Sequence, residues 1–401
     1  MRIMKKFIAV FLSIVLSMLN PVYNLSVNAS GVGVVGINVY TFNVGSGACS
    51  IVKFTISNGT KQYILVDAGC GYNRAKPDEE YVQTVRVINN FIKKEGITRF
   101  KYIILSHFDS DHIKMLEEIM TKNKFTVGQF IYRKYDGIIW QRLKKADGMV
   151  AENSGKLTGE KLCQVYHNAK EVEKVISKFE KRISKKVALS PYLDSGNDIV
   201  IGNDVSNGAG GYEAVKVTIK FLNKNPSYFS HFSTKSNKFA YDYRLASNND
   251  SLVFTISYQD PRKEYHNKKD CVKKILFCGD IQSNAMNGLR NRFSLYAADC
   301  DLVLWPHHGK VLGVERKENK EYTQYKDLWE KNPVYRSNFT NVVAKGKETY
   351  CFVSSDRASA AGSVMDAANL NRLNTFYTYG SKYLMAFFDI INSNKISISK
   401  H

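Results

Sequence analysis

The start of the chain alternates apolar and polar residues in the way that β-strands do. The segment "INVYTFNVGSGACSIVKFTI" (37–56) predicts two strands on either side of a turn at residues 45–47, because two glycines interrupt the alternation there. The run "QYILVDAG" (62–69) predicts a third strand. These runs follow one another at hairpin spacing, so the sequence predicts a small antiparallel meander.

The pattern then changes to helices and strands in turn. Residues 78–94 show helical spacing of apolar positions, and "FKYIILSH" (100–107) is a short β-rich run. This run ends abruptly in the polar "FDSDH" (108–112), after which "IKMLEEIM" (113–120) has helical spacing again. The order of strand, polar loop and helix places the side chains of residues 107–112 at the carboxyl end of a strand.

The rest of the chain predicts one long helix and a second sheet. Apolar positions recur three and four residues apart from residue 160 to residue 186, which predicts an amphipathic helix. The alternating "VKVTIKFL" (215–222) begins the second sheet. Further short strands are predicted at "SLVFTISY" (251–258), "KKILFCGD" (273–280), "DLVLWPHHG" (301–309) and "CFVSSD" (351–356), and helical pieces at "NRFSLYAA" (291–298) and "VMDAANLNRL" (364–373). This alternation is typical of an α/β fold.

The first 29 residues have the pattern of a secretory signal peptide. Three cations (Arg2, Lys5 and Lys6) precede an apolar run at residues 7–19, and small residues at Val27 and Ala29 suit cleavage before residue 30. The apolar run is too short to span a bilayer, although an uncleaved anchor is the alternative. We therefore expect a secreted or extracytoplasmic protein that keeps no stable membrane span after cleavage of the signal.

The chain is strongly basic, with 57 Lys and Arg against 37 Asp and Glu and a formal charge of +20. The signal segment carries only three of these cations, so the mature part would keep +17. Such a charge attracts DNA or another polyanion, but it selects neither a fold nor a reaction. The cysteines form no CxxC pair and do not suggest a disulfide framework; they are Cys49, Cys70, Cys163, Cys271, Cys278, Cys300 and Cys351.

Four potential metal ligands lie within six residues in "SHFDSDH". They are His107, Asp109, Asp111 and His112. In an extended segment alternate side chains share one side, so the first three could converge, and the fourth approaches from the helix start. The alternative is a capped helix start with Asp111 near the helix dipole. The density of ligands favours a metal site.

Two further polar groups follow predicted strands in the second half. Asp280 ends "ILFCGD", and His307 and His308 end "DLVLWPHH". A carboxylate can bridge two cations and an imidazole can complete the second, and this arrangement stabilises the attacking and leaving oxygens in hydrolysis. The three strand ends together predict a site for two divalent ions.

The set of motifs resembles the metallo-β-lactamase fold superfamily and, within it, the competence-type (ComEC/Rec2-like) hydrolase branch. The resemblance runs from about residue 37 to residue 388, through "YTFNVGSGACSIV", "YILVDAG", "LSHFDSDHI", "NNDSLVFTISY", "ILFCGD" and "WPHHG". It implies a four-layer αββα sandwich over residues 30–401, with a helical insertion at about 116–207. It also implies a metal-dependent hydrolase.

The resemblance also assigns roles to individual residues. His107 and Asp109 would hold one metal ion, Asp111 and His112 the other, and Asp280 would bridge the two. His308 is favoured over His307 as the last ligand. The catalytic candidates are Asp111, which would accept or orient the proton of the attacking water, and Asp67, which would support the ligand loop by hydrogen bonding.

The sequence departs from the superfamily pattern in ways that bear on the metal. Many members have a histidine at the position of Asp109 and a third histidine from mid-chain, whereas His167, His231 and His266 lie in no recognisable motif here. The cofactors expected are two divalent ions, Zn²⁺ or Mn²⁺, because an oxygen-rich site tolerates Mn²⁺. Further departures remove negative charge or add positive charge near the cleft, at Asn43, Ser46, Ala48, Lys114, Met115 and Lys310.

These observations predict a secreted, dinuclear metallohydrolase that cleaves a phosphodiester bond of DNA or a nucleotide with metal-bound hydroxide. The basic charge and the 24 Tyr and 22 Phe are compatible with phosphate steering and base stacking. Two alternatives remain open: an amide or lactone hydrolase of the same fold, and a surface protein that binds nucleic acid or another polyanion without cleaving it.

Overall fold

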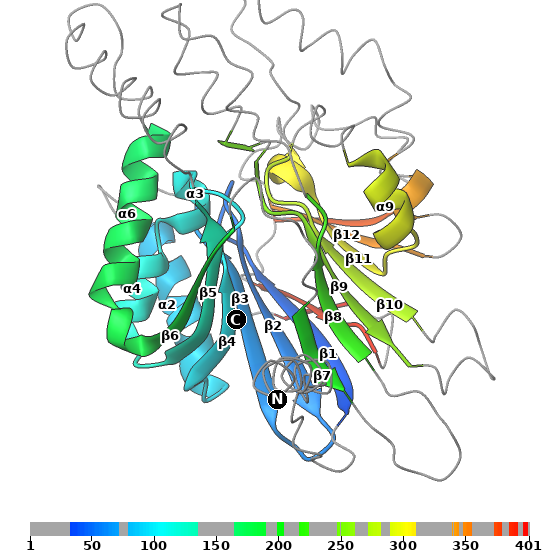
Figure 1. The fold of residues 1–401 in the computed structure, drawn as a ribbon, viewed down its shortest axis with the longest axis horizontal. Coiled ribbons are helices and arrows are strands. Elements are labelled where there is room, and N and C mark those ends of the chain that lie inside the picture. Colours follow the sequence, from blue (N-terminus) through cyan, green and yellow to red (C-terminus); the bar gives the residue numbers. More distant parts are fainter. Residues whose placement is uncertain are drawn as a thin grey trace, which may run out of the picture.

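The computed structural model of the chain describes residues 33–71, 79–134, 164–189, 199–203, 216–223, 247–248, 250–260, 272–281, 289–309, 339, 341–344, 348–354, 373–378, 385–391 and 396–399. Within these ranges, two β-sheets face each other and helices lie on their outer sides (Figure 1). The predicted α/β class and the four-layer αββα arrangement are thereby confirmed. No helix in the described ranges is long and apolar enough to cross a membrane.

The first sheet has the strand order β15-β14-β1-β2-β3-β4-β5-β6. The meander β1–β2–β3 is antiparallel, and β3, β4, β5 and β6 then run parallel to one another. The strand bounds are β1 Val34–Phe42, β2 Cys49–Ile56, β3 Lys61–Ala68, β4 Arg99–Ile104, β5 Thr126–Arg133, β6 Ile183–Leu189, β14 Met385–Asp389 and β15 Ile396–Ser399. The parallel arrangement brings the carboxyl ends of β3 and β4 to one edge of the sheet.

The second sheet has the order β13-β12-β11-β10-β9-β8-β7. Its strands β10 to β13 are parallel, and β7, β8 and β9 are antiparallel to their neighbours. The bounds are β7 Ile199–Asn203, β8 Lys216–Phe221, β9 Phe254–Gln259, β10 Val272–Phe277, β11 Leu302–Leu304, β12 Tyr350–Val353 and β13 Asn374–Tyr377. The carboxyl ends of β10 and β11 therefore also share an edge.

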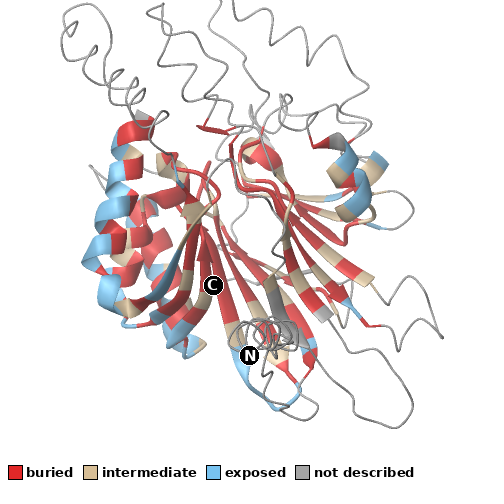
Figure 2. Cartoon of the chain, viewed as in Figure 1, coloured by how far each residue is buried: buried red, intermediate tan, exposed pale blue. Residues whose placement is uncertain are grey.

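Helices cover the outer face of each sheet. Figure 1 shows α2 (Glu79–Lys94), α4 (Leu116–Lys122) and α6 (Gln164–Lys178) beside the first sheet, and α9 (Arg290–Tyr296) beside the second. Each of these helices turns its apolar side to a sheet, and Figure 2 shows exposed positions on the outward faces of the helices. Two short helices, α3 (Ser110–Ile113) and the 3-10 turn η5 (Pro306–Gly309), lie at the site itself.

The central core lies between the two sheets. It combines aromatic and β-branched side chains from both, including Phe54, Ile64, Phe254 and Phe277. The rings of Phe254 and Phe277 stack with centroids 4.8 Å apart and an interplanar angle of 11°. This core fixes the distance between the sheets, and thereby the distance between the loops that follow their strands.

Phe254→Ala should reduce the free energy of unfolding by about 3–5 kcal/mol, since a fully buried ring is replaced by a cavity that the stacked Phe277 cannot fill. Urea unfolding followed by circular dichroism measures this. Leu295→Ala is the matched control, because the Leu295 side chain is 69% exposed on α9 and its loss should change stability by less than about 0.5 kcal/mol. Equal effects of the two substitutions would contradict the assignment of the core.

The predicted helix over 160–186 needs correction. Residues 160–163 lie outside the described residues, and α6 ends at Lys178. A 3-10 turn (Glu180–Arg182) follows, and Ile183 begins β6, which pairs in parallel with β5. Ile183 continues the helical spacing of apolar residues. As the start of a strand, however, it pairs with β5, whose backbone groups on that side would otherwise have no partner strand.

The insertion predicted at about 116–207 also needs correction in its described part. This part contains α4, β5, α6 and β6 of the first half of the fold, together with β7 of the second sheet. These elements are part of the sandwich, since β5 and β6 extend the parallel sheet from β4. The helix predicted at 113–120 is divided into α3 and α4, and the second sheet begins at β7 rather than at β8.

Some predictions fall outside the described residues. They include the signal peptide at 1–29, the helical piece at 364–372 and the histidines His231 and His266. Secretion and the boundary of a mature domain at residue 30 therefore stay predictions.

Candidate metal centre

The candidate metal ligands come from three strand ends on facing sheets. In the first sheet, residues 105–109 follow β4 and lead into α3. In the second sheet, Asp280 follows β10, and His307 and His308 form the turn η5 after β11. The amide of His307 donates to the carbonyl of Gly279 over 3.0 Å, which joins the two loops of the second sheet.

Close backbone packing holds the loop with Asp111 in place. The amide of Ala48 donates to the carbonyl of Asp111 over 3.0 Å. A Cβ at Gly69 would lie 2.0 Å from that carbonyl oxygen, and one at Gly47 would lie 2.8 Å from it. Gly47 and Gly69 are thus required because the meander approaches the ligand loop too closely there for any side chain.

The loop with Asp280 is constrained in a similar way. Gly279 has φ +54, a conformation that glycine adopts without strain, and a Cβ there would lie 2.7 Å from the Cβ of Ser251. The hydroxyl of Ser251 accepts the amide of Asp280 over 3.0 Å. The turn between β10 and Asp280 therefore aims the carboxylate at the facing sheet.

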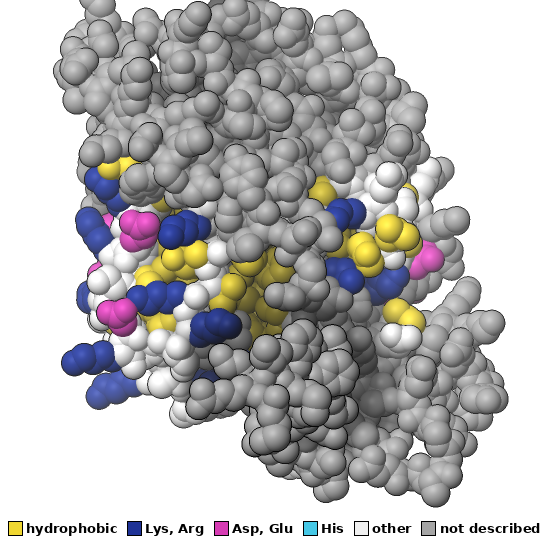
Figure 3. Space-filling model, in the orientation of Figure 1, with side chains coloured by type: hydrophobic (Ala, Val, Ile, Leu, Met, Phe, Trp, Pro, Cys, Tyr) yellow, Lys and Arg dark blue, Asp and Glu magenta, His cyan; other side chains and the backbone are white. Residues whose placement is uncertain are grey.

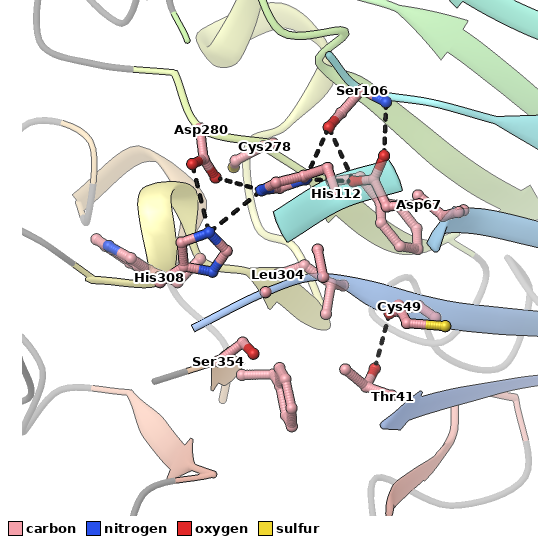
Figure 4. A pocket seen from close by; sticks show the side chains of 18 of the residues that line it. Thr41, Cys49, Asp67, Ser106, His112, Cys278, Asp280, Leu304, His308 and Ser354 are labelled. Carbon is pink, nitrogen blue, oxygen red and sulfur yellow. Dashed lines mark hydrogen bonds and ion pairs between the residues drawn. The ribbon is translucent and has the colours of Figure 1, made fainter. Parts of the chain in front are cut away.

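Four of the predicted ligands form one cluster. Asp111, His112, Asp280 and His308 each offer a ligand atom, and these atoms lie within 4.8 Å of one another. Figure 4 shows His112 pointing at Asp280 and His308 across the gap between the sheets. The two imidazole Nε2 atoms are 3.2 Å apart. Residues nearly two hundred positions apart in the sequence thus meet at one point.

Asp280 lies at the centre of the histidines. Its Oδ1 is 3.0 Å from His112 Nε2, and its Oδ2 is 3.3 Å from His308 Nε2 and 3.8 Å from His107 Nε2. His307 Nε2 lies at 3.9 Å from Oδ2. Both carboxylate oxygens therefore face imidazole nitrogens, as a bridging ligand requires.

The other predicted ligands differ in burial and in their distance from the cluster. His107 is fully buried beside Asp280, and Asp109 is buried at the N-cap position of α3. The His307 side chain is 18% exposed, and its Nε2 lies 3.4 Å from the amide of Asn248, whereas His308 is buried within the cluster. His167 is exposed on α6, away from this group, and Lys310 lies outside the described residues.

Asp67 lies behind the ligands and contacts Ser106 and the ligand His112. Its Oδ1 accepts the amide of Ser106 over 2.7 Å, and its Oδ2 accepts the Ser106 hydroxyl over 2.8 Å. The same Oδ2 lies 2.9 Å from His112 Nδ1. Asp67 has φ 54, so this buried carboxylate is held in a strained conformation, which is typical of functional positions.

The charges of the cluster depend on one another. Burial alone would raise the pKa of Asp280, but the positive charges of His308, His112 and His307 hold it well below its ordinary value. Burial would likewise raise the pKa of Asp111, and the hydrogen bond and charge of His308 lower it. Both carboxylates are therefore ionised, which is the form that binds a cation.

The histidines divide into two kinds. Burial, reinforced by the charge of His112, lowers the pKa of His107 to about 4, so this imidazole is neutral at neutral pH. Burial opposes the charged forms of His112 and His308 as well, but Asp280 outweighs it and raises both pKa values. The carboxylates thus favour positive charge at these two imidazoles, and a divalent cation would supply the same charge.

The donor set fits divalent metal ions. His107 Nε2 is a buried nitrogen with no hydrogen-bond partner in the described part of the chain, and it faces Asp280. Imidazole and carboxylate donors together suit Zn²⁺ and Mn²⁺. The adjoining pocket has an empty space of about 530 Å³, and its walls include His112, Asp280 and His308. Buried donors that converge in this way indicate a metal site.

The sequence reasoning did not single out three residues of this site. Ser106 contacts Asp67 and the ligand histidines, Ser251 supports Asp280, and Asn248 contacts His307. Ser106 is the residue before His107, so its place beside the ligands was open to inference. Asn248 and Ser251 lie in the motif "NNDSLVFTISY", but the sequence gave them no role, because the return of the chain from β8 to β9 is what brings them to the site.

Part of the chain matches a known protein family. Residues 43–147 match the family model of the metallo-beta-lactamase superfamily. This match covers Asp67 and the ligand loop at 107–112, and it confirms the superfamily resemblance over that stretch. Comparison with curated protein sequences gives no match.

Solved structures of low sequence identity are similar to the chain. The metallo-beta-lactamase fold protein YhfI from Bacillus subtilis is 9% identical with a TM-score of 0.36, and the alignment covers 88% of this chain and 99% of that one. Zn(2+)-bound PqqB from Methylobacterium extorquens is 10% identical with a TM-score of 0.38, covering 85% and 97%. A diphosphatase from the PhnP family is 9% identical with a TM-score of 0.34, covering 88% and 99%.

The similarity to this superfamily rests on the match over residues 43–147 rather than on these structures. Two facing sheets with outer helices carry a ligand cluster where their strand ends meet. The donor set of this cluster fits divalent metal ions.

Asp67→Asn should weaken zinc binding about 10- to 100-fold, which is the usual effect of removing a group that orients a metal ligand. The asparagine amide has one acceptor oxygen and one donor nitrogen, so it cannot accept from Ser106 and His112 at both positions, and the imidazole of His112 loses its orientation. Competition with a fluorescent zinc chelator measures the affinity. Asn89→Ala is a control, because Asn89 is buried and bonded to Asn123 away from the ligands. An unchanged affinity for Asp67→Asn would show that Asp67 has no orienting role.

Proposed function

We propose that the chain is a secreted, dinuclear metal-dependent phosphodiesterase that acts on DNA or another nucleic-acid substrate, as in the competence-type branch. One observation carries the dinuclear part: both carboxylate oxygens of Asp280 face imidazole nitrogens, and these belong to His112, His308 and His107. A carboxylate surrounded in this way is suited to hold two cations rather than one.

The residues would divide between the two ions. His107 and Asp109 would hold one, Asp111 and His112 the other, with Asp280 shared and His308 completing the second. When bound, divalent ions supply acidified water and positive charge for the attacking and leaving oxygens. The number and identity of the ions, Zn²⁺ or Mn²⁺, belong to this proposal.

Asp111 is placed to handle a proton. Its side chain is 19% exposed, whereas that of Asp280 is only 4% exposed, and its Oδ2 lies 3.4 Å from His308 Nε2. Because the carboxylate is ionised and partly exposed, it can accept the proton of the attacking water. His308 is close enough to keep that carboxylate oriented.

Charge supports a phosphodiester substrate. The formal charge is +20, and in Figure 3 Lys and Arg side chains predominate over Asp and Glu on the visible part of the α6 and β6 side. Such a field raises the local concentration of a polyanion and speeds its encounter with the site. A neutral lactam or lactone would gain nothing from it.

The test combines metal analysis with a choice of substrates. The purified mature protein, loaded with Zn²⁺ or Mn²⁺, is given plasmid DNA, bis-p-nitrophenyl phosphate and a chromogenic β-lactam, with and without chelator. The proposal expects two metal equivalents and cleavage of the phosphodiesters that the chelator abolishes. Hydrolysis of the β-lactam alone would overturn the substrate assignment. DNA binding without cleavage in excess metal would overturn the enzymatic assignment.

A further inference from the structure

The hydroxyl of Ser106 lies between Asp67 and both histidines of the ligand loop. Its Oγ is 2.8 Å from Asp67 Oδ2, 3.0 Å from His107 Nδ1 and 3.2 Å from His112 Nδ1. The side chain is buried, and Figure 4 shows it on the side of His112 away from His308. A hydroxyl with this many polar neighbours and no access to water must divide its hydrogen bonds among them.

The backbone of Ser106 fixes the position of that hydroxyl. Its amide donates to Asp67 Oδ1 over 2.7 Å, and its carbonyl accepts the amide of Leu252 from the second sheet over 2.7 Å. Gly279 leaves room beside it, since a Cβ at that glycine would lie 3.0 Å from the Cβ of Ser106. The serine is therefore held by both halves of the sandwich.

The protons can be assigned by counting donors and acceptors. A carboxylate only accepts hydrogen bonds, whereas a hydroxyl donates one and can accept others. The contact with Asp67 is the shortest that Oγ makes and is assisted by charge, so the single hydroxyl proton goes to Asp67 Oδ2. The contact at 3.0 Å can then be a hydrogen bond only if His107 Nδ1 donates to Oγ.

This assignment determines the free nitrogen of His107. With the proton on Nδ1, the neutral ring leaves Nε2 as a bare lone pair. That atom is buried, has no hydrogen-bond partner in the described ranges and lies 3.8 Å from Asp280 Oδ2. His112 donates from its Nδ1 to Asp67 directly, because that nitrogen lies 2.9 Å from Asp67 Oδ2. One carboxylate thus orients two imidazoles, the second through a serine.

We propose that Ser106 is a positioning residue. Its hydroxyl donates to Asp67 and accepts a hydrogen bond from His107 Nδ1, and this keeps the His107 Nε2 lone pair turned toward the metal centre. The proposal rests on the proposed metal site, but it makes a claim about the protein without metal as well. It predicts the tautomer of one particular imidazole and the substitution that changes it.

The experiment uses the metal-free protein labelled with ¹⁵N in its histidines. Long-range ¹H–¹⁵N correlation spectra report which ring nitrogen carries the proton, and His107→Gln identifies the signals of that residue. We expect a protonated Nδ1 for His107 in the wild type and a shift toward protonated Nε2 in Ser106→Ala. His112 is an internal reference, because its direct contact with Asp67 remains. Ser106→Thr keeps the hydroxyl and should restore the wild-type spectrum.

Zinc titration is the second readout. Ser106→Ala should bind zinc about 10- to 100-fold more weakly, as expected for a lost outer-shell partner, and Ser106→Thr should recover most of this loss. Ser50→Ala is the matched control, since Ser50 is buried beside the same pocket but its hydroxyl contacts Thr41. A protonated Nε2 in wild-type His107, or an unchanged tautomer and zinc affinity in Ser106→Ala, would overturn the relay. A wild type with the expected tautomer that binds no metal would overturn the proposed function and leave the hydrogen-bond relay standing.

Discussion

Asp280→Asn is expected to lower metal-dependent hydrolysis by more than about 100-fold, because loss of even an outer-shell partner costs 10- to 100-fold. The substitution preserves the shape of the side chain and removes its negative charge. In the wild type this charge lies between three imidazoles, at distances of 3.0 Å to His112, 3.3 Å to His308 and 3.8 Å to His107. The measurement is turnover of the phosphodiester substrate, with the metal content of the same sample determined by mass spectrometry.

The metal content decides what the loss of Asp280 means. If Asp280 is shared by two metal ions, the substitution should weaken the binding of both. If Asp280 is a ligand of one ion only, the other ion should stay bound. Asp260→Asn is the matched control. This aspartate is also buried, and it follows the carboxyl end of β9, whereas the site lies at the start of that strand. It accepts the Tyr258 hydroxyl over 3.1 Å. It should keep its metal and its activity. Full metal content and activity in Asp280→Asn would remove Asp280 from the centre.

The ligand loop was predictable because its information is local. Alternation identifies a strand up to residue 107, and the density of His and Asp directly after it marks a metal site before any folding is considered. Asp280 and the paired histidines are weak signals alone, and they gained weight only through the shared feature of following a strand. The structure brings Asp111, His112, Asp280 and His308 together. Their spacing in the sequence does not give the distances between them.

The features that sequence reasoning missed depend on partners far along the chain. The end of α6 is set by pairing of Ile183–Leu189 with β5, and the apolar spacing of Ile183 fits either a helix or a strand. The strands β14 and β15 join the first sheet beside β1, although they come from the end of the chain. Ser106 is a common residue whose role comes from Asp67, 39 positions earlier. Each depends on a contact that local propensity does not encode.

Alanine substitutions at the two histidines of η5 are expected to differ more in their effect on activity than substitutions at any other pair of neighbouring residues in the site. Both have φ 51, a left-handed conformation that is uncommon outside glycine, so replacing either with alanine carries a similar backbone cost. Their side chains differ. His308 is buried, with Nε2 3.3 Å from Asp280 and 3.4 Å from Asp111, whereas His307 is 18% exposed and lies 3.9 Å from Asp280. The pair therefore separates the effect of the side chain from that of the backbone.

His308→Ala should lose metal and reduce hydrolysis by more than about 100-fold, because it removes an imidazole that contacts both carboxylates of the cluster. His307→Ala should cost about 10-fold or less, the scale of one hydrogen bond, here the 3.4 Å contact with Asn248. Zinc titration and phosphodiester turnover of both variants provide the comparison, with thermal unfolding as a check that the two fold equally well. If His307→Ala proved the more damaging, the ligand would be the outer histidine, and the turn after β11 would have to rearrange when metal binds.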